Sequence, residues 1–290
     1  MLKNSFKNNV VEHDDSLDIR SGSPLTALDI NSKSTVQPNA LLRLSVFTPD
    51  ARDGSRHIVT TDVTEILSEL NFSRSEGYDS ITIRGPSLNM SVDFRVWRGV
   101  VRALNLHGFN NGELTISFKE FATLCGYPAK RLERRFRESI HESLARLRGS
   151  TLDFKKSSTM SGGTVTGLLL KGYWDSDNDI VKLLADDRLW DLYLLDHNTI
   201  LKSDIFDMLP RQEVAQCLYT YIQSLPLQAT KVSYKRLRER LQIKSDDRVI
   251  DRAVDNLKKI GYLRAYKVGT GRDKFLIIEK KCNKLSFNKV

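Results

Sequence analysis

The fold is decided by the stretch Thr230–Glu279, which reads TKVSYKRLRERLQIKSDDRVIDRAVDNLKKIGYLRAYKVGTGRDKFLIIE. Its first half predicts two short helices. Ser233 precedes the first of them, Tyr234–Leu241, and its hydroxyl can accept a backbone N–H that a helix start leaves without a partner. The helical pattern then breaks at Gln242–Ser245, so a turn is expected between the two helices.

The second helix of this stretch is expected to begin after Ser245 or Asp246, either of which can cap it, and to end near Ile260, where Gly261 supplies a stop. Apolar residues recur along it at the spacing of one helical face. The apolar face comprises Val249, Ala253, Val254, Leu257 and Ile260, and the opposite face comprises Arg248, Asp251, Arg252, Asp255 and Lys259.

Two strand-like runs follow, Tyr262–Val268 and Lys274–Glu279, joined by the glycine-containing tip Gly269–Asp273. The order of helix, turn, helix and hairpin is typical of a winged helix-turn-helix. Its second helix has the size that fits the major groove of DNA.

The positive charge of the chain is concentrated in the same region. The formal net charge is +9. Residues 1–40 hold four basic and five acidic groups, residues 41–200 hold 21 of each, and residues 201–290 hold 20 basic and 10 acidic groups. A basic surface attracts a polyanion and releases its counterions on binding. Because the charge coincides with the helix-turn-helix pattern, the sequence favours nucleic acid over a merely solvated lysine-rich face.

Length and composition are those of a globular protein. The chain has 290 residues, of which 40% are hydrophobic and 28% charged, enough for two domains. It has no apolar run of membrane-spanning length and no signal-peptide pattern, so we expect a cytoplasmic protein that does not enter a membrane. Cys125, Cys217 and Cys282 match no zinc-site spacing. The first two lie in apolar helical patterns and are expected to be buried thiols.

The beginning of the chain differs from the rest. Residues 1–38 are rich in Asn, Ser, Asp and Lys without a sustained apolar period, which predicts a disordered tail ending at Pro38. The next run, Ala40–Phe47, is strand-like.

The middle of the chain predicts the same order of elements as the C-terminal stretch. Asp93 can cap a helix over Phe94–Leu106. A strand is expected over Glu113–Phe118, and Ser117 can cap a short helix, Phe118–Cys125. This predicted helix, strand and helix lead into a longer basic helix.

The longer helix is expected to have Pro128 in its first turn and Gly149 just past its end. Its buried stripe is predicted to be Leu132, Phe136, Ile140, Leu144 and Leu147. Five cations crowd its first half, and we expect two or three of them to face DNA because they repel one another without a polyanion nearby. They are Lys130, Arg131, Arg134, Arg135 and Arg137.

A hairpin is predicted after this helix. Its strands are Thr151–Lys155 and Val165–Trp174, and its tip is Ser157–Gly163. A further strand is expected over Asp179–Leu184. The tip carries no charge, so we expect this hairpin to contribute little to DNA binding and to be available to a second subunit.

These patterns together predict an α+β fold with two tandem winged-helix domains after a disordered N-terminal tail. The expected divisions are a tail at 1–38, an N-terminal winged-helix domain for dimerisation and accessory DNA contact at 39–200, a C-terminal winged-helix domain for the main sequence-specific contact at 201–282, and a short basic tail at 283–290.

An ordered set of short segments resembles the plasmid replication initiators, and is most similar to the RepA initiators of IncFIB-type plasmids. The resemblance covers roughly residues 35–280, and its parts gain specificity from their order. The segments are Thr35–Phe47, Ser75–Tyr78, Gly85–Met90, Asp93–Trp97, Phe118–Ala122, Tyr219–Pro226 and Ile260–Leu263.

The resemblance implies a bacterial, plasmid-associated initiator of theta replication with two winged-helix domains. It implies binding to directly repeated origin sites, called iterons, and opening of an adjacent AT-rich stretch. It also implies recruitment of the host initiator and the replicative helicase, and an exchange between monomers and dimers in which the dimer represses its own promoter.

The sequence lacks the residue patterns that enzymatic alternatives would need. A rolling-circle nickase needs paired histidines for a metal and a tyrosine nucleophile, and no two of the five histidines are close in sequence. No phosphate-binding loop of ATPase type is present. The acidic run Asp175, Asp177 and Asp179 has no later glutamate at calcium-loop spacing.

We therefore predict a non-enzymatic initiator without metal or cofactor that binds double-stranded origin DNA. The alternatives are a winged-helix transcriptional repressor using the same domains and, with less support, a nicking or recombining enzyme. The residues expected to bind DNA are Lys130, Arg131, Arg134, Arg135, Arg137, Lys244, Arg248, Arg252, Lys259, Lys267, Arg272 and Lys274.

Overall fold

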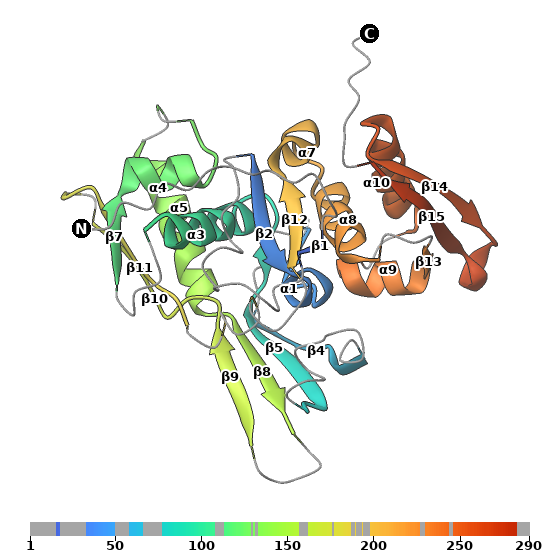
Figure 1. The fold of residues 1–290 in the computed structure, drawn as a ribbon, viewed down its shortest axis with the longest axis horizontal. Helices are drawn as coiled ribbons and strands as arrows, with labels where there is room; N and C mark the ends of the chain where they lie inside the picture. Colours follow the sequence, from blue (N-terminus) through green and yellow to red (C-terminus); the bar gives the residue numbers. More distant parts are fainter. Residues whose placement is uncertain are drawn as a thin grey trace.

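The structure is a computed structural model of the chain (Figure 1). It describes residues 16–17, 33–49, 58–65, 77–107, 113–128, 130, 133–156, 162–175, 177–186, 189, 193, 198–226, 230–243 and 246–282. The mixture of helices and strands that the sequence predicts is confirmed.

Two units share one order of elements, and they lie on opposite sides of the molecule in Figure 1. The N-terminal unit consists of α3 (Asp93–His107), β7 (Leu114–Ser117), α4 (Phe118–Leu124), α5 (Arg134–Arg148), β10 (Lys171–Asp175) and β11 (Ile180–Leu184). The C-terminal unit consists of α8 (Glu213–Ser224), β13 (Thr230–Ser233), α9 (Tyr234–Leu241), α10 (Arg248–Lys259), β14 (Leu263–Val268) and β15 (Phe275–Lys281). The sheet orders also match, β10-β11-β7 in one unit and β14-β15-β13 in the other.

The helices of the C-terminal unit begin and end close to where the sequence predicts. The Ser233 hydroxyl accepts the backbone N–H of Arg236, which confirms the predicted cap of α9. The carboxylate of Asp246 accepts the N–H of Arg248 at 3.2 Å at the start of α10. The turn after α9 passes through Gln242, whose φ of 50° lies in the left-handed region.

A central sheet of strand order β1-β12-β2 lies between the units and overturns part of the predicted tail. Its strands are β1 (Ser16–Leu17), β2 (Ser34–Pro38) and β12 (Asn198–Lys202). Every residue of β2 is buried, so the prediction of disorder up to residue 38 is wrong there. The polar side chains of β2 are accommodated by hydrogen bonds, since Trp97 Nε1 donates to Gln37 Oε1 at 2.8 Å.

The strand predicted over Ala40–Phe47 is also wrong. The chain forms the short helix α1 (Asn39–Arg43) and then β3 (Phe47–Thr48), which pairs in parallel with β6 (Leu88–Asn89). Pro38 is the last residue of β2, where it pairs with Asn198 of β12, and its φ of −64° is compatible with a helix start. The extended segment therefore ends at Pro38 and α1 begins at the next residue.

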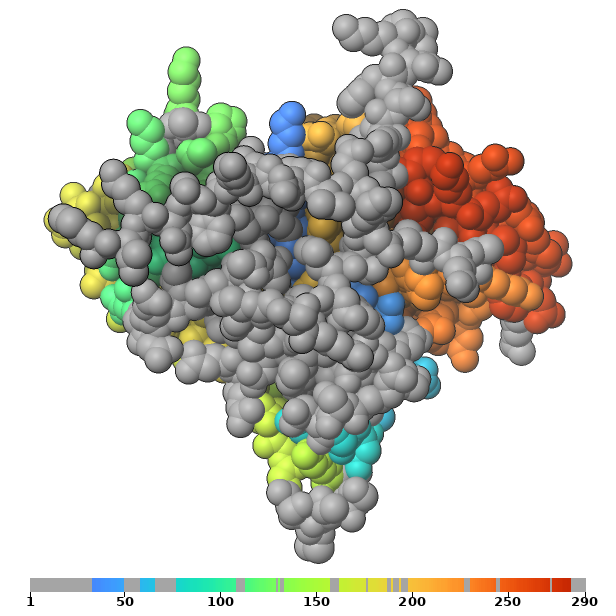
Figure 2. Space-filling view, viewed as in Figure 1, coloured from blue at the N-terminus to red at the C-terminus, as the bar shows by residue number. Residues whose placement is uncertain are grey.

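The predicted N-terminal hairpin belongs to a different sheet from the one expected. Strands β4 (Ile58–Asp62), β5 (Ser80–Pro86), β8 (Thr151–Lys155) and β9 (Gly163–Gly167) form a four-stranded sheet that projects from the body in Figures 1 and 2. The run predicted as one strand, Val165–Trp174, is divided between β9 here and β10 in the N-terminal unit. The hairpin next to α5 in the N-terminal unit's own sheet is therefore β10–β11, and the tip residues 157–161 lie outside the described residues.

The basic helix starts later than expected. α5 begins at Arg134, so Pro128 precedes the helix instead of lying in its first turn. The reason is that the chain at Tyr127 still closes α4: its N–H donates to Ala122 O at 3.0 Å, and its ring packs on Phe136 with centroids 4.7 Å apart. The stripe Phe136, Ile140, Leu144 and Leu147 is buried as predicted.

One apolar core runs through the described residues from unit to unit. Phe94 of α3 packs on Phe47 at 5.0 Å and on Phe206 at 5.5 Å between ring centroids, and Phe206 belongs to α7 (Ser203–Met208), between β12 and α8. Cys125 and Cys217 are buried thiols, as predicted. None of the described helices combines the length and the apolar character that a membrane crossing requires.

Candidate nucleic-acid interface

The exposed face of α10 carries the cations that the sequence assigns to DNA. Ile250, Val254 and Leu257 are buried against the core, whereas Arg248, Arg252 and Lys259 are exposed together with Asp255. Ile250 occupies the buried face of α10, whereas Val249, which the sequence predicts for that face, is only half-buried. α10 thus presents a basic face to solvent. The C-terminal unit to which it belongs lies on the right in Figure 2.

The two arginines of this face differ in their surroundings. Arg248 Nε lies 3.3 Å from Asp246 Oδ2, and both side chains are exposed. Arg252 makes no ion pair with any residue that the structure describes. It lines an open groove between α10 and the start of α8, opposite Arg211. Arg211 is exposed and was not singled out from the sequence, because it lies outside the helix-turn-helix pattern.

The other side of α10 is tied to the hairpin β14–β15 by a charge cluster around Asp251. Its carboxylate accepts the Tyr234 hydroxyl at 2.7 Å and lies 3.1 Å from Lys274 Nζ and 3.3 Å from Lys267 Nζ. Burial alone would raise the pKa of Asp251, but hydrogen bonds from these three groups outweigh burial and its pKa is lowered. The pKa of Tyr234 is raised by burial and by its bond to the carboxylate.

This cluster separates the hairpin cations that the sequence treated alike. Lys274 is only 17% exposed and stacks on the Tyr234 ring, whereas Lys267 is 38% exposed at the rim. Arg272 lies in the turn Gly271–Asp273, but its side chain is outside the described residues, as is Lys244.

The cations of the first basic helix also divide into two groups. Lys130, Arg134 and Arg135 are exposed; Arg134 is 92% exposed and bonds Glu138 at 2.8 Å one turn along α5. Arg137 is turned inward: one Nη lies 2.7 Å from the Asp179 carboxylate, and its guanidinium covers the Phe118 ring at 4.3 Å. Arg131 lies outside the described residues.

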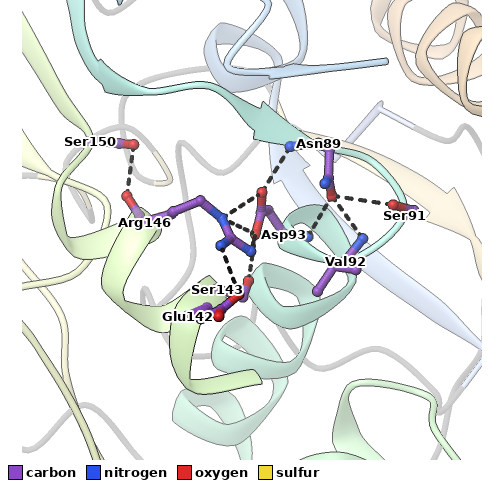
Figure 3. A network of polar contacts seen from close by, with 8 residues as sticks. All are labelled: Asn89, Ser91, Val92, Asp93, Glu142, Ser143, Arg146 and Ser150. Atoms are coloured by element: carbon purple, nitrogen blue, oxygen red, sulfur yellow. Dashed lines mark hydrogen bonds and ion pairs between the residues drawn. The ribbon is translucent and has the colours of Figure 1, made fainter. Parts of the chain in front are cut away.

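A buried polar network holds α5 against α3 (Figure 3). Asp93 is fully buried and accepts from Ser143 Oγ at 2.7 Å and from the Arg146 guanidinium at 2.7 and 3.0 Å. Asn89 accepts the N–H of Asp93, and Asp93 accepts the N–H of Asn89. Asn89 is therefore the residue that caps α3, and the predicted cap Asp93 has a different role: it joins the two helices.

A second set of polar contacts joins the C-terminal unit to the α1 segment. Arg240 of α9 donates to Arg43 O at 2.5 Å, Ser45 Oγ donates to Arg240 O, and Arg43 donates to Ser224 O. Burial lowers the pKa of Arg240 to about 10. Because these bonds cross from α1 to α8 and α9, they fix how α9 sits against the α1 segment.

In the described part of the chain, no three His, Cys, Asp or Glu side chains lie close enough together to bind a metal ion.

Comparison with known proteins assigns the chain to a family. No protein-family model matches it. "Replication protein RepA" of Escherichia coli is 42% identical over 262 residues, covering 89% of this chain and 92% of that protein. "RepFIB replication protein A" of Salmonella typhi is 38% identical over 268 residues, covering 89% of this chain and 82% of that protein. The chain belongs to the RepA family of plasmid replication initiators.

The predicted family resemblance is thereby confirmed. Among solved structures, a crystal structure of domains 2 and 3 of RctB matches 84% of this RepA-family chain and 98% of its own chain, with a TM-score of 0.53. At 12% sequence identity the likeness concerns the fold alone. The DNA contacts and the division into domains at residue 200 stay predictions.

Proposed function

We propose that this RepA-family protein starts plasmid replication by binding repeated sites in the origin sequence-specifically, with both units acting as winged-helix domains. The observation that carries the proposal is the basic outer face of α10, formed by Arg248, Arg252 and Lys259. The order of helices and strands in each unit, with a hairpin after the third helix, supports the winged-helix assignment.

The dimensions of α10 suit the role of a recognition helix. Twelve residues give a helix about 18 Å long, which fits lengthwise in a major groove about 12 Å wide. Arg248 and Arg252 lie one turn apart on its exposed face, so both can reach base edges from one groove. Lys259, at the last turn of α10, would bind phosphate.

The N-terminal unit would make a second, weaker contact. Its third helix, α5, presents Arg134 and Arg135, with Lys130 just before it. Two units of one type can cover a longer stretch of DNA than one unit alone. Dimerisation through the N-terminal unit, opening of an AT-rich stretch and recruitment of the host initiator and replicative helicase complete the proposal and rest on the family. In this account the protein acts by binding and performs no catalysis.

A replication assay separates an initiator from a repressor that uses the same DNA surface. The protein is supplied in trans to a selectable plasmid that carries only its own origin, and transformants are counted. We expect transformants with the wild type and few or none with the double variant Arg248→Ala, Arg252→Ala. A Lys235→Ala variant is the matched control, since Lys235 is an exposed cation on α9. Wild-type protein that binds the origin but yields no transformants would leave only the repressor.

A further inference from the structure

The two units correspond residue by residue at the junction between the hairpin and the helices. Ser117 caps α4 and Ser233 caps α9, each by accepting the N–H three residues later. In both units the serine lies opposite the first residue of the last strand, β11 or β15. Asp179 and Lys274 immediately precede those strands, so they occupy equivalent positions.

The aromatic residue after each serine confirms the correspondence. Phe118 donates its backbone N–H to Asp179 O at 3.0 Å, and Tyr234 donates to Lys274 O at 2.9 Å. These are the first residues of α4 and α9.

The third helix supplies the remaining partner in each unit. Arg137 is the fourth residue of α5, and Asp251 is the fourth residue of α10. Arg137 pairs with Asp179 at 2.7 Å, and Asp251 pairs with Lys274 at 3.1 Å. The cation of each pair covers the aromatic ring of its own unit, at 4.3 Å in the N-terminal unit and 4.0 Å in the C-terminal unit.

We propose that these two ion pairs are equivalent clamps of opposite polarity that fix the hairpin against the third helix, and that in the C-terminal unit Asp251 and Lys274 are positioning residues for DNA recognition and not DNA contacts. This inference rests on the proposed DNA-binding function. It removes Lys274 from the predicted phosphate contacts and gives a role to Asp251, an acid on the helix that reads DNA.

The burial of Lys274 supports a positioning role. Its ammonium already faces Asp251 at 3.1 Å, Asp247 at 3.8 Å and the Tyr234 ring, with 17% of the side chain exposed. A cation contributes to the salt dependence of DNA binding by releasing counterions from phosphate, and a lysine already paired inside the protein has little charge to offer. Lys267, at the rim of the same cluster, has a more exposed side chain than Lys274.

The clamp also affects the recognition face directly. Asp251 is the neighbour in sequence of Arg252, so an unpaired carboxylate there would repel the DNA backbone. Pairing with Lys274 neutralises that charge and holds β14–β15 beside α10 at the same time. Loss of either partner loosens β14–β15 beside α10, and loss of Lys274 also leaves the carboxylate to Lys267 alone, so we expect both changes to weaken binding to all DNA without removing a phosphate contact.

The inference can be tested by giving the C-terminal unit the three residue types that form the clamp of the N-terminal unit. The triple variant Tyr234→Phe, Asp251→Arg, Lys274→Asp reproduces in the C-terminal unit the set Phe118, Arg137 and Asp179, with the charges exchanged. Asp247 remains near the new carboxylate, but it is paired with Arg238 at 2.5 Å. Lys267 remains near the new guanidinium, since it lies 3.3 Å from Asp251 in the wild type. The single variants Asp251→Asn and Lys274→Met each remove the pair between Asp251 and Lys274.

Three quantities are measured for the full-length chain: affinity for its own plasmid origin, the slope of log affinity against log salt concentration, and hydrogen exchange of residues 263–281 without DNA. We expect each single variant to lose affinity about tenfold with an unchanged slope and to exchange faster in the hairpin. The triple variant should regain at least half of that loss on a logarithmic scale and recover hairpin protection.

Two results would overturn the inference. A salt slope that falls by about 0.9 in Lys274→Met would show that this lysine binds phosphate directly. A triple variant no better than the single variants in affinity and protection would show that the polarity cannot be exchanged. If the wild type does not prefer its origin, the proposed function fails, while hydrogen exchange in the free protein still tests the clamp.

Discussion

The buried pair of Asp93 and Arg146 gives the sharpest stability prediction. Asp93 has 0% exposure and Arg146 has 12%, and the shortest distance between them is 2.7 Å. In the variant Asp93→Asn the negative charge disappears and an amide NH₂ faces the guanidinium. Arg146, only 12% exposed, then keeps just the exposed Glu142 carboxylate, 3.7 Å away, and we expect the loss of its buried partner to cost about 3–5 kcal/mol of unfolding free energy.

The predicted loss can be measured by urea unfolding followed through tryptophan fluorescence. Trp97 is fully buried on α3, the helix that begins at Asp93, and so reports on this junction. At about 2–4 °C per kcal/mol for a chain of this size, the melting temperature should fall by about 6–20 °C. Arg146→Met should lower the unfolding free energy by a similar amount, because it leaves the buried Asp93 carboxylate without its cation. A double variant with both changes should lose less unfolding free energy than the sum of the two single losses.

The matched control is Lys235→Met. Lys235 lies 3.8 Å from Glu239 one turn along α9, with side chains 77% and 55% exposed. An exposed pair of this kind contributes about 0.2–1 kcal/mol. A loss below about 1 kcal/mol for Asp93→Asn, equal to that of the control, would refute the argument that the network in Figure 3 holds α5 against α3.

Three further predictions follow from single positions. Arg252→Ala should cost about 1–3 kcal/mol of binding free energy on origin DNA and less on random DNA, measured by fluorescence anisotropy beside Lys235→Ala; equal losses on both DNAs would show a phosphate contact only. The pKa of Asp251 is lowered on folding, so the stability that its carboxylate contributes is present above its unfolded pKa of about 3.9 and is lost as the pH falls through the folded pKa. The difference in unfolding free energy between wild type and Asp251→Asn should therefore shrink only below about pH 4. A difference that shrinks nearer pH 7 would implicate another group. Gly99→Ala should destabilise the chain by about 1–3 kcal/mol, since the new Cβ would lie 2.2 Å from Cys125 Sγ, and Cys125→Ala should relieve part of the loss in a urea titration of the double variant.

The parts of the fold that could be predicted are those specified by local sequence. The cap at Ser233, the length of α9 and the buried face of α10 depend on residues within a few positions of one another. The same holds for Ser117 and α4. Local rules of this kind give the helix order of both units, and with it the fold class.

The errors lie where distant segments pair. β2 is a strand because it hydrogen-bonds to β12, which is about 160 residues later, and its sequence STVQP has no apolar alternation to reveal this. The sequence predicts the β8–β9 hairpin beside α5 because the hairpin directly follows that helix in the chain. Its real partner is β5, in a sheet that no local pattern specifies.

The exposed face of α10 could be predicted in part. Helical periodicity gives Arg248, Arg252, Asp255 and Lys259 correctly as exposed, but it also puts Asp251 on that face, and the structure ties Asp251 to the hairpin. The sequence also predicts Arg137 and Lys274 as DNA-binding cations, because it gives the sign of a charge but not the partner of that charge. The one available signal was the shared order of serine and aromatic residue, Ser117-Phe118 and Ser233-Tyr234, which aligns the two units.

The two units therefore differ in how many cations each leaves for DNA. In the N-terminal unit the clamp takes a cation from the third helix itself, Arg137, and Glu138 partly neutralises Arg134. In the C-terminal unit the helix contributes the acid and the hairpin contributes the cation, so Arg252 stays without an ion pair among the described residues. Arg248, however, lies 3.3 Å from Asp246, and Asp255 is exposed on the same face of α10, so the clamp accounts for one cation and not for the whole difference between the units. The larger difference is the net charge of +10 carried by residues 201–290 against zero for residues 41–200, and it makes the C-terminal unit our candidate for the main contact with DNA.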